Sequence, residues 1–175
     1  MYEVGDKVVY PHHGAGTVVK KEQREILGQK REYLTIQILH NDMTVNVPSE
    51  NAEKVGLRKV IDVDMVEVVF KALTGGGTQM PKNWNRRFKH NRDKMKTGDI
   101  LELAEVVRNL SLRDQEKGLS TGEKQMFVKA KKILASELMY AKGMDEDEAS
   151  AWLEEVLADV GANGSKALSG VAGER

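Results

Sequence analysis

The spacing of hydrophobic residues divides the chain into an N-terminal part with strand-like patterns and a C-terminal part with helix-like patterns. Short runs rich in β-branched residues, separated by tight turns, predict strands. These runs are VGDKVVY from residue 4, GTVVKKEQREIL from residue 16, REYLTIQIL from residue 31 and MTVNVP from residue 43. Gly28-Gln29-Lys30 predicts a hairpin, and Pro48 predicts the end of the last strand. We therefore expect a small curled sheet or barrel that packs on the rest of the chain, because so short a segment is marginally stable alone.

From residue 62 onward, the hydrophobic residues recur with the spacing of amphipathic helices. Helices are expected over residues 62–73, 81–95, 99–116, 121–142 and 145–160. Asp62 or Asp64 is expected to cap the first helix, and Pro81 suits the first turn of the second. Ser120 and Glu123 have the spacing of a capping box at the start of the fourth. Each helix is too short to be stable alone in water, so we expect them to pack together.

These patterns predict an α+β protein with two domains and no internal repeat. The predicted divisions are a β-rich domain over 1–53, a connector over 54–62, a helical domain over 63–160 and a disordered tail over 161–175. The tail is assigned from its content of Gly, Ala and Ser.

Charge is strongly segregated along the chain, although the formal net charge is zero. Residues 82–96 hold seven Lys or Arg and one Asp, whereas residues 143–160 hold seven Asp or Glu and no Lys or Arg. The field that attracts a polyanion comes from the local patch and not from the sum of charges. The basic run is therefore a candidate nucleic-acid surface. The acidic run is interpreted as a solvated helix face, with Trp152 in the core.

Trp84 lies inside the basic run, and two interpretations of it remain open from the pattern alone. A large aromatic side chain is costly to expose, so one interpretation buries Trp84 against neighbouring helices. In the other, Lys and Arg neutralise phosphates while an exposed ring inserts beside a base step. If the helix over 121–142 packs beside the run, a second basic set would extend the same face: Lys124, Lys129, Lys131 and Lys132.

The sequence shows no combination of residues that is typical of a catalytic or metal site. Adjacent His12 and His13 point opposite ways on an extended chain, which makes them poor ligands for one metal ion. Gly75-Gly76-Gly77 follows a helix and is not followed by Gly-Lys-Ser/Thr, which favours a helix end over a phosphate-binding loop. We expect a protein that is not an enzyme, with no cofactor, no metal and no small-molecule substrate.

The location of the protein is expected from what the sequence lacks. It has no cysteine, no basic segment followed by an apolar run at its start, and no apolar stretch long enough to span a bilayer. A cytoplasmic protein without a membrane partner is therefore expected.

Seven stretches, in order, closely resemble the CarD/CdnL family of bacterial transcription regulators. They are VGDKVVYPHHGAG (4–16), KREYLTIQI (30–38), TVNVPSENAEKVGLR (44–58), PKNWNRRFKHN (81–91), LAEVVRNL (103–110), RDQEKGLSTGEK (113–124) and AKKILASEL (130–138). The resemblance implies a Tudor-like β-barrel that binds the β subunit of RNA polymerase. It also implies a helical domain that contacts promoter DNA just upstream of the −10 element, and hence a nucleoid-associated protein.

The resemblance also implies roles for particular residues. Trp84 matches the tryptophan that wedges into the minor groove at the upstream edge of the bubble. The basic residues expected to face DNA are Arg86, Arg87, Lys89 and Lys124. The polymerase contact is expected at Arg24 and along the strand that holds Val45, Asn46 and Val47. Some relatives have an arginine at the position of Asn46, and an amide cannot replace the bidentate pairing of a guanidinium.

The function expected from these observations is regulation of transcription initiation by a monomer that stabilises the promoter open complex without reading base sequence. Two rivals make different predictions. A general architectural DNA-binding protein would not bind polymerase. A protein–protein adaptor would use the helical domain for protein contacts and bury Trp84 in its core.

Overall fold

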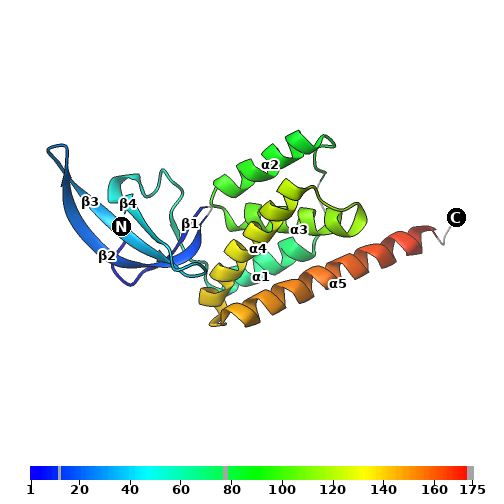
Figure 1. Ribbon diagram of the computed structural model, residues 1–175. Coiled ribbons are helices and arrows are strands. Elements are labelled where there is room, and N and C mark those ends of the chain that lie inside the picture. Colours follow the sequence, from blue (N-terminus) through cyan, green and yellow to red (C-terminus); the bar gives the residue numbers. More distant parts are fainter. Residues whose placement is uncertain (12, 77–78, 173–175) are drawn as a thin grey trace.

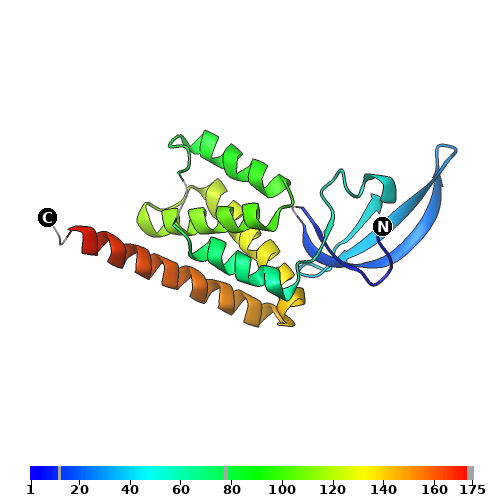
Figure 2. The ribbon, with the colours of Figure 1, turned by 180° about the vertical axis from the view of Figure 1, so that it is seen from behind.

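The computed structural model describes residues 1–11, 13–76 and 79–172, with residues 161–172 described as helix backbone only. Figure 1 shows a molecule with a β-sheet at one end and a group of helices at the other. The same two parts are seen from behind in Figure 2, where α5 runs along the helical domain and extends away from the sheet. The predicted α+β class, with the sheet first and the helices second, is confirmed.

The N-terminal domain is one antiparallel five-stranded sheet with strand order β4-β3-β2-β1-β5. Its strands are β1 (Lys7–Tyr10), β2 (Gly14–Ile26), β3 (Gln29–Ile38), β4 (Thr44–Pro48) and β5 (Arg58–Lys59). A short 3₁₀ helix, η1 (Ser49–Asn51), follows β4. The prediction of a connector over 54–62 is wrong at β5, because Arg58 and Lys59 pair with Val9 and Val8 of β1. β5 is the edge strand on this side of the sheet. It has only two residues, too few to show the alternation of apolar and polar residues that predicts a strand.

The long hairpin of β2 and β3 ends in a two-residue turn. Ile26 pairs with Gln29, and the two residues between them, Leu27 and Gly28, have φ values of 54° and 77°. Positive φ at both central positions is typical of the type I′ turn, whose twist matches that of the strands it joins. The predicted hairpin is confirmed, and its turn lies one residue earlier than Gly28-Gln29-Lys30.

One face of the sheet forms the core of the N-terminal domain. Alternate residues of each strand point to opposite faces, so Leu34, Ile36 and Ile38 of β3 lie together. They pack with buried side chains of the neighbouring strands and the segment after β4: Val8, Val18, Val47, Ala52 and Leu57.

The C-terminal domain consists of α1 (Val63–Thr74), α2 (Trp84–Lys96), α3 (Ile100–Glu116), α4 (Thr121–Lys142) and α5 (Glu146–Ala172). Asp62 caps α1 by accepting a hydrogen bond from the Met65 amide, and Ser120 caps α4 in the same way through Glu123. Gly143 ends α4 in the left-handed conformation, with φ of 64°. These predicted helix ends are confirmed.

Two predicted helix boundaries are wrong. α2 begins at Trp84 and not at Pro81, because the side chain of Asn83 accepts hydrogen bonds from the amides of Asn85 and Arg86 and fixes the start there. α5 continues to Ala172, where a disordered tail from residue 161 was expected. That stretch contains no proline, which would have broken the helix.

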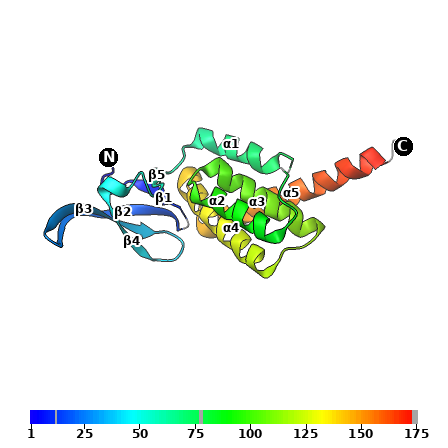
Figure 3. The same ribbon diagram turned by 90° about the horizontal axis from the view of Figure 1, so that it is seen from above.

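The helices bury their apolar faces in a single core. Its fully buried side chains include Val69, Leu73, Leu110, Leu134 and Leu138, from α1, α3 and α4. Trp152 of α5, predicted to be core, is half-buried and packs against this cluster with its ring centroid 6.2 Å from that of Phe70. α1 and α4 lie on opposite sides of the domain, as the view from above shows (Figure 3).

The two domains are joined through the C-terminal half of α4, where a buried carboxylate receives an arginine from β5. Glu137 is fully buried, and its two oxygens accept hydrogen bonds of 2.6 Å each from the guanidinium of Arg58. The amide of Ile61 donates a third bond of 2.8 Å to the same carboxylate. A buried charge is stable only when its hydrogen-bonding capacity is filled in this way, so Glu137 fixes where the chain passes from sheet to helices.

Strand β2 also contacts α4 directly. The amide of Ala15 donates to the Ser136 hydroxyl at 2.9 Å, and the hydroxyls of Thr17 and Tyr140 lie 2.8 Å apart. Gly14 permits this approach, because its φ of +100° is unfavourable for other residues and a Cβ there would lie 3.0 Å from the Ser136 oxygen. The domains therefore meet through specific polar contacts, which restrict their relative orientation.

We predict that Glu137→Ala destabilises the protein by about 3 kcal/mol, because it leaves the Arg58 guanidinium and the Ile61 amide without their shared partner. Urea unfolding measures the change. Glu155→Ala, which removes an exposed carboxylate of α5, is the matched control and should change the free energy of unfolding little. Equal effects of the two substitutions would contradict the structural role of Glu137.

Candidate nucleic-acid interface

Trp84 is the first residue of α2, and 52% of its surface is exposed. The helix buries a different set of positions, since Arg87, Asn91 and Met95 recur every four residues and face the domain. The interpretation of Trp84 as a core residue is therefore wrong. A large aromatic ring at the surface of a basic helix is available to a partner.

The outward face of α2 carries the exposed cations of the basic run. These are Arg86, Lys89, Arg92 and Lys96. Lys94 belongs to the same run but is turned inward, where its ammonium lies 2.6 Å from Glu105 and 3.2 Å from Glu102 of α3. Its charge is therefore neutralised within the protein.

The structure contradicts the predicted DNA-facing role of Arg87. Its side chain is 3% exposed and forms a bidentate pair with Glu123, which is 1% exposed, at distances of 2.7 and 2.8 Å. It also donates to the carbonyl of Lys82 at 3.0 Å. Arg87 thus connects the segment before α2, the first turn of α2 and the first turn of α4. These contacts fix the start of α2, where Trp84 lies.

Glu123 has a structural role, beyond helix capping, that the sequence pattern did not identify. Its Oε1 accepts a hydrogen bond from the Ser120 hydroxyl at 3.0 Å in addition to the two from Arg87. The hydrogen bond from Arg87 lowers the pKa of the Glu123 carboxyl from 4.5, although burial acts in the opposite direction. The same bond raises the pKa of the Arg87 guanidinium. The pair therefore stays charged at neutral pH.

The Arg87–Glu123 pair brings the start of α2 next to the start of α4. A second contact supports it, because a Cβ at Gly122 would lie only 3.4 Å from the ring of Phe88. Lys124 follows directly after this contact and is exposed. Trp84, Arg86, Lys89 and Lys124 are therefore on neighbouring helical turns of one domain.

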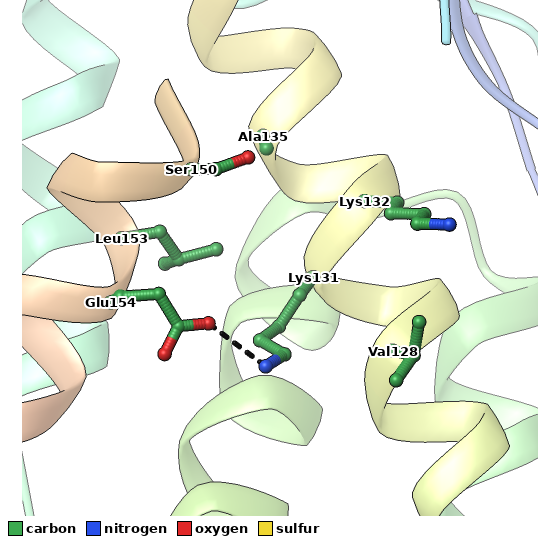
Figure 4. Close-up of a pocket in the computed structure, with 7 residues that line it drawn as sticks. All are labelled: Val128, Lys131, Lys132, Ala135, Ser150, Leu153 and Glu154. Carbon is green, nitrogen blue, oxygen red and sulfur yellow. Dashed lines mark hydrogen bonds and ion pairs between the residues drawn. The ribbon is translucent and has the colours of Figure 1, made fainter. Parts of the chain in front are cut away.

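The second basic set does not form one face. Lys131 lies against α5, where its ammonium contacts Glu154 at 2.9 Å, whereas Lys132 points away from α5 (Figure 4). Lys124, Lys129 and Lys132 are the exposed members. These three line one groove of α4, whereas Lys131 is turned toward α5 and does not belong to that face.

The residues predicted to contact polymerase lie on two faces of the sheet. Asn46 and Arg24 share the outer face: the Asn46 oxygen accepts from the Thr35 hydroxyl at 2.7 Å, and the Arg24 guanidinium lies 5.7 Å from the ring of Tyr33. Arg24 is also paired with Glu22 at 2.6 Å. The outer face therefore offers a guanidinium on β2 and an amide on β4, with β3 between them.

Val45 and Val47 point to the opposite face of β4, toward the core, and Val47 is only 2% exposed. Val47 is buried and Val45 is half-buried against the core, so what these two residues mainly offer a partner is their backbone. β4 is an edge of the sheet, since it pairs only with β3 over the described residues. Edge strands can accept a strand of another protein by hydrogen bonds of the main chain.

Other candidate chemistry is limited. Over residues 1–11, 13–76 and 79–172, no group of three His, Asp or Glu side chains is placed to hold a metal ion. No helix in the same residues has the length and apolar character needed to cross a membrane. Gly75 caps the end of α1, as expected, while Gly77 and His12 lie outside the described residues.

Comparisons with known proteins match both halves of the chain. Residues 2–61 match the family described as CarD-like/TRCF RID domain, and residues 68–154 match the family described as CarD, C-terminal domain. The protein named "Putative transcription factor YdeB" from Bacillus subtilis (strain 168) is 37% identical over 148 residues, which cover 85% of this chain and 97% of that protein.

Among solved structures, the 72-residue N-terminal domain of Myxococcus xanthus CarD, determined by solution NMR, is 34% identical. The match covers 34% of this chain and 79% of that domain, with a TM-score of 0.30.

The buried Arg87–Glu123 pair predicts a pH dependence of stability. Because the folded protein lowers the pKa of Glu123 below 4.5, the pair contributes stability above that pH and loses it as the pH falls through the lowered pKa. We expect Glu123→Gln to reduce the free energy of unfolding by about 3 kcal/mol near neutral pH, and by less at an acidic pH well below 4.5. Urea unfolding at both pH values measures this.

Glu116→Gln, at an exposed carboxylate near the end of α3, is the control for loss of one acid. It should change stability little at either pH. A deficit of Glu123→Gln that is the same at both pH values would contradict the assignment of the ionised pair.

Proposed function

Because the chain belongs to the CarD family of transcription factors, we propose that it regulates initiation by holding promoter DNA open while bound to RNA polymerase. The N-terminal sheet binds the polymerase β subunit, and the helical domain contacts the DNA just upstream of the −10 element. Neither contact reads base sequence. The observation that carries the proposal is the exposed ring of Trp84 at the start of a helix that exposes four cations and one acid, Asp93.

The polymerase contact uses the edge strand β4 and the outer face of the sheet. Main-chain groups of β4 accept a strand of the polymerase, which requires no particular side chain at Val45 or Val47. Arg24, on the same outer face but on β2 and paired with Glu22, supplies a guanidinium, while Asn46 of β4 supplies an amide. The contact raises the local concentration of the helical domain at the promoter, so a weak DNA surface is sufficient.

The DNA contact combines phosphate neutralisation with a wedge. Arg86, Lys89 and Lys124 are exposed and hold the phosphate backbone around Trp84. The Trp84 ring enters the minor groove at the upstream edge of the bubble, where a base step is already distorted. Closed duplex offers no such step, so the ring favours the open state.

The effect on transcription follows from differential affinity. A ligand shifts an equilibrium only by as much as it binds one state better than the other. A preference of about 1.4 kcal/mol for the open promoter multiplies the population of open over closed complexes by about ten. One partly inserted aromatic ring supplies energy of that order.

We predict that Trp84→Ala abolishes most of the increase in open-complex lifetime that the wild-type protein causes. The substitution should alter the free energy of unfolding by less than about 1 kcal/mol, because the ring is half exposed. Lifetimes are measured with bacterial RNA polymerase on a promoter after addition of a competitor. Trp84→Phe, which keeps a flat apolar ring, should retain part of the effect. Full activity of Trp84→Ala would contradict the wedge.

We predict that Arg24→Glu weakens binding to the polymerase β subunit by tenfold or more, about 1.4 kcal/mol, because it reverses the charge of this side chain on the outer face of β2. Asn46→Arg should strengthen binding, since a guanidinium can form charge-assisted bonds that an amide cannot. Lys54→Glu, at an exposed loop position of the same domain, controls for the change in net charge. Unchanged affinity in both Arg24→Glu and Asn46→Arg would contradict the assignment of the contact to this face, whereas no binding by the wild type would favour an architectural DNA-binding protein that does not contact polymerase.

A further inference from the structure

The outward face of α4 carries positive charge without any negative charge. The helix contains two acidic residues, Glu123 and Glu137, and both are buried and paired with arginines from other elements. Its lysines at positions 124, 129 and 132 are exposed. The arginines therefore neutralise the acids inside the protein, while the exposed lysines keep their full charge.

These three lysines have neither an acidic partner within 4 Å nor a contact with an aromatic ring among the described residues, unlike Lys131 and Lys142 of the same helix. Lys131 contacts Glu154 at 2.9 Å, and Lys142 lies 4.6 Å from the centre of the Trp152 ring. Figure 4 shows the contrast between the adjacent Lys131 and Lys132, of which the first reaches across to α5 and the second turns away. An unpaired row of this kind is strongly solvated and attracts anions.

The row reaches the N-terminal domain. Lys124, Lys129 and Lys132 line a groove together with Gln125, Val128 and His40, the last of which lies at the end of β3 and contacts the His13 carbonyl at 2.6 Å. The positive field extends into this junction: burial, and then the charges of Lys129 and His40, lower the pKa of His13.

We infer that the outward face of α4 is a second contact for the DNA phosphate backbone, along which the duplex passes from Trp84 toward the junction of the two domains. This inference rests on the proposed DNA contact at α2, because Lys124 belongs to both surfaces. Residues 124 to 132 span about 12 Å along a helix axis. One DNA strand presents a phosphate about every 3.4 Å of its axis, so the row is long enough for about three phosphates.

The side chains on this face fit a nucleic-acid backbone better than a protein surface. Lysine ammonium groups are mobile point charges that neutralise phosphates without selecting a sequence. Val128 is the one large hydrophobic residue exposed in the groove, at 48%, whereas protein interfaces centre on a cluster of buried aromatic or aliphatic residues. The face thus resembles the non-specific part of a DNA-binding surface.

The test uses the full-length double variant Lys129→Gln/Lys132→Gln, which leaves Lys124 and α2 unchanged. Binding to a fluorescent duplex of about 30 base pairs with an unpaired segment at one end is followed by anisotropy over a range of salt concentrations. Each lost phosphate contact should lower the slope of log affinity against log salt by about one, so the double variant should lose about two units. Lys54→Gln/Lys71→Gln removes the same charge from exposed positions elsewhere and should keep the wild-type slope.

A slope for Lys129→Gln/Lys132→Gln equal to that of the control would overturn the inference, as would the absence of saturable binding by the wild type at low salt. Open-complex lifetimes of the same variants separate this inference from the proposed function. If Trp84→Ala removes the lifetime effect while the two lysine variants bind DNA equally, only the α4 contact is wrong. If the α4 variant loses salt dependence while Trp84→Ala keeps full activity, the α4 contact stands and the wedge is wrong.

Discussion

The arrangement of the whole molecule depends on two buried carboxylates of one helix. Glu123, near the start of α4, holds Arg87 of α2, and Glu137, near its end, holds Arg58 of β5. Each carboxylate has its lone pairs filled by an arginine fork and one further donor, which makes a buried charge tolerable. α4 therefore contacts the proposed DNA surface near its start and the sheet near its end.

This arrangement explains how a protein with zero net charge can present a basic surface. The two acids of α4 are buried, and the other acids are on other elements, six of them on α5, so the exposed lysines of α4 have no acid of their own helix beside them. It also explains why an exposed tryptophan can be held in a defined position. Trp84 makes no large core contact of its own, and its place is set by the Asn83 cap and by the buried Arg87 three residues later. A wedge that acts by differential affinity needs this kind of fixed presentation.

Local signals predicted much of the fold. The capping box at Ser120 and Glu123, the glycine at position 143 and the strand ending at Pro48 are properties of a few adjacent residues, and the structure confirms them. The failures involve partners far apart in sequence. β5 is a strand only because it pairs with β1. Arg86 and Arg87 are adjacent, and the contact with Glu123 decides that Arg87 is the one turned inward. The exposure of Trp84 agrees with the family resemblance and could not have been chosen from the basic run alone.

The central claim is that the ring at position 84 lies against promoter DNA when the protein is on the polymerase. A photo-crosslinking amino acid in place of Trp84, in an otherwise intact chain, tests this in promoter complexes formed by bacterial RNA polymerase. The account predicts crosslinks to DNA at the upstream edge of the bubble, with strong dependence on the presence of polymerase. Crosslinks to protein alone, or DNA crosslinks distributed along the duplex regardless of polymerase, would contradict it.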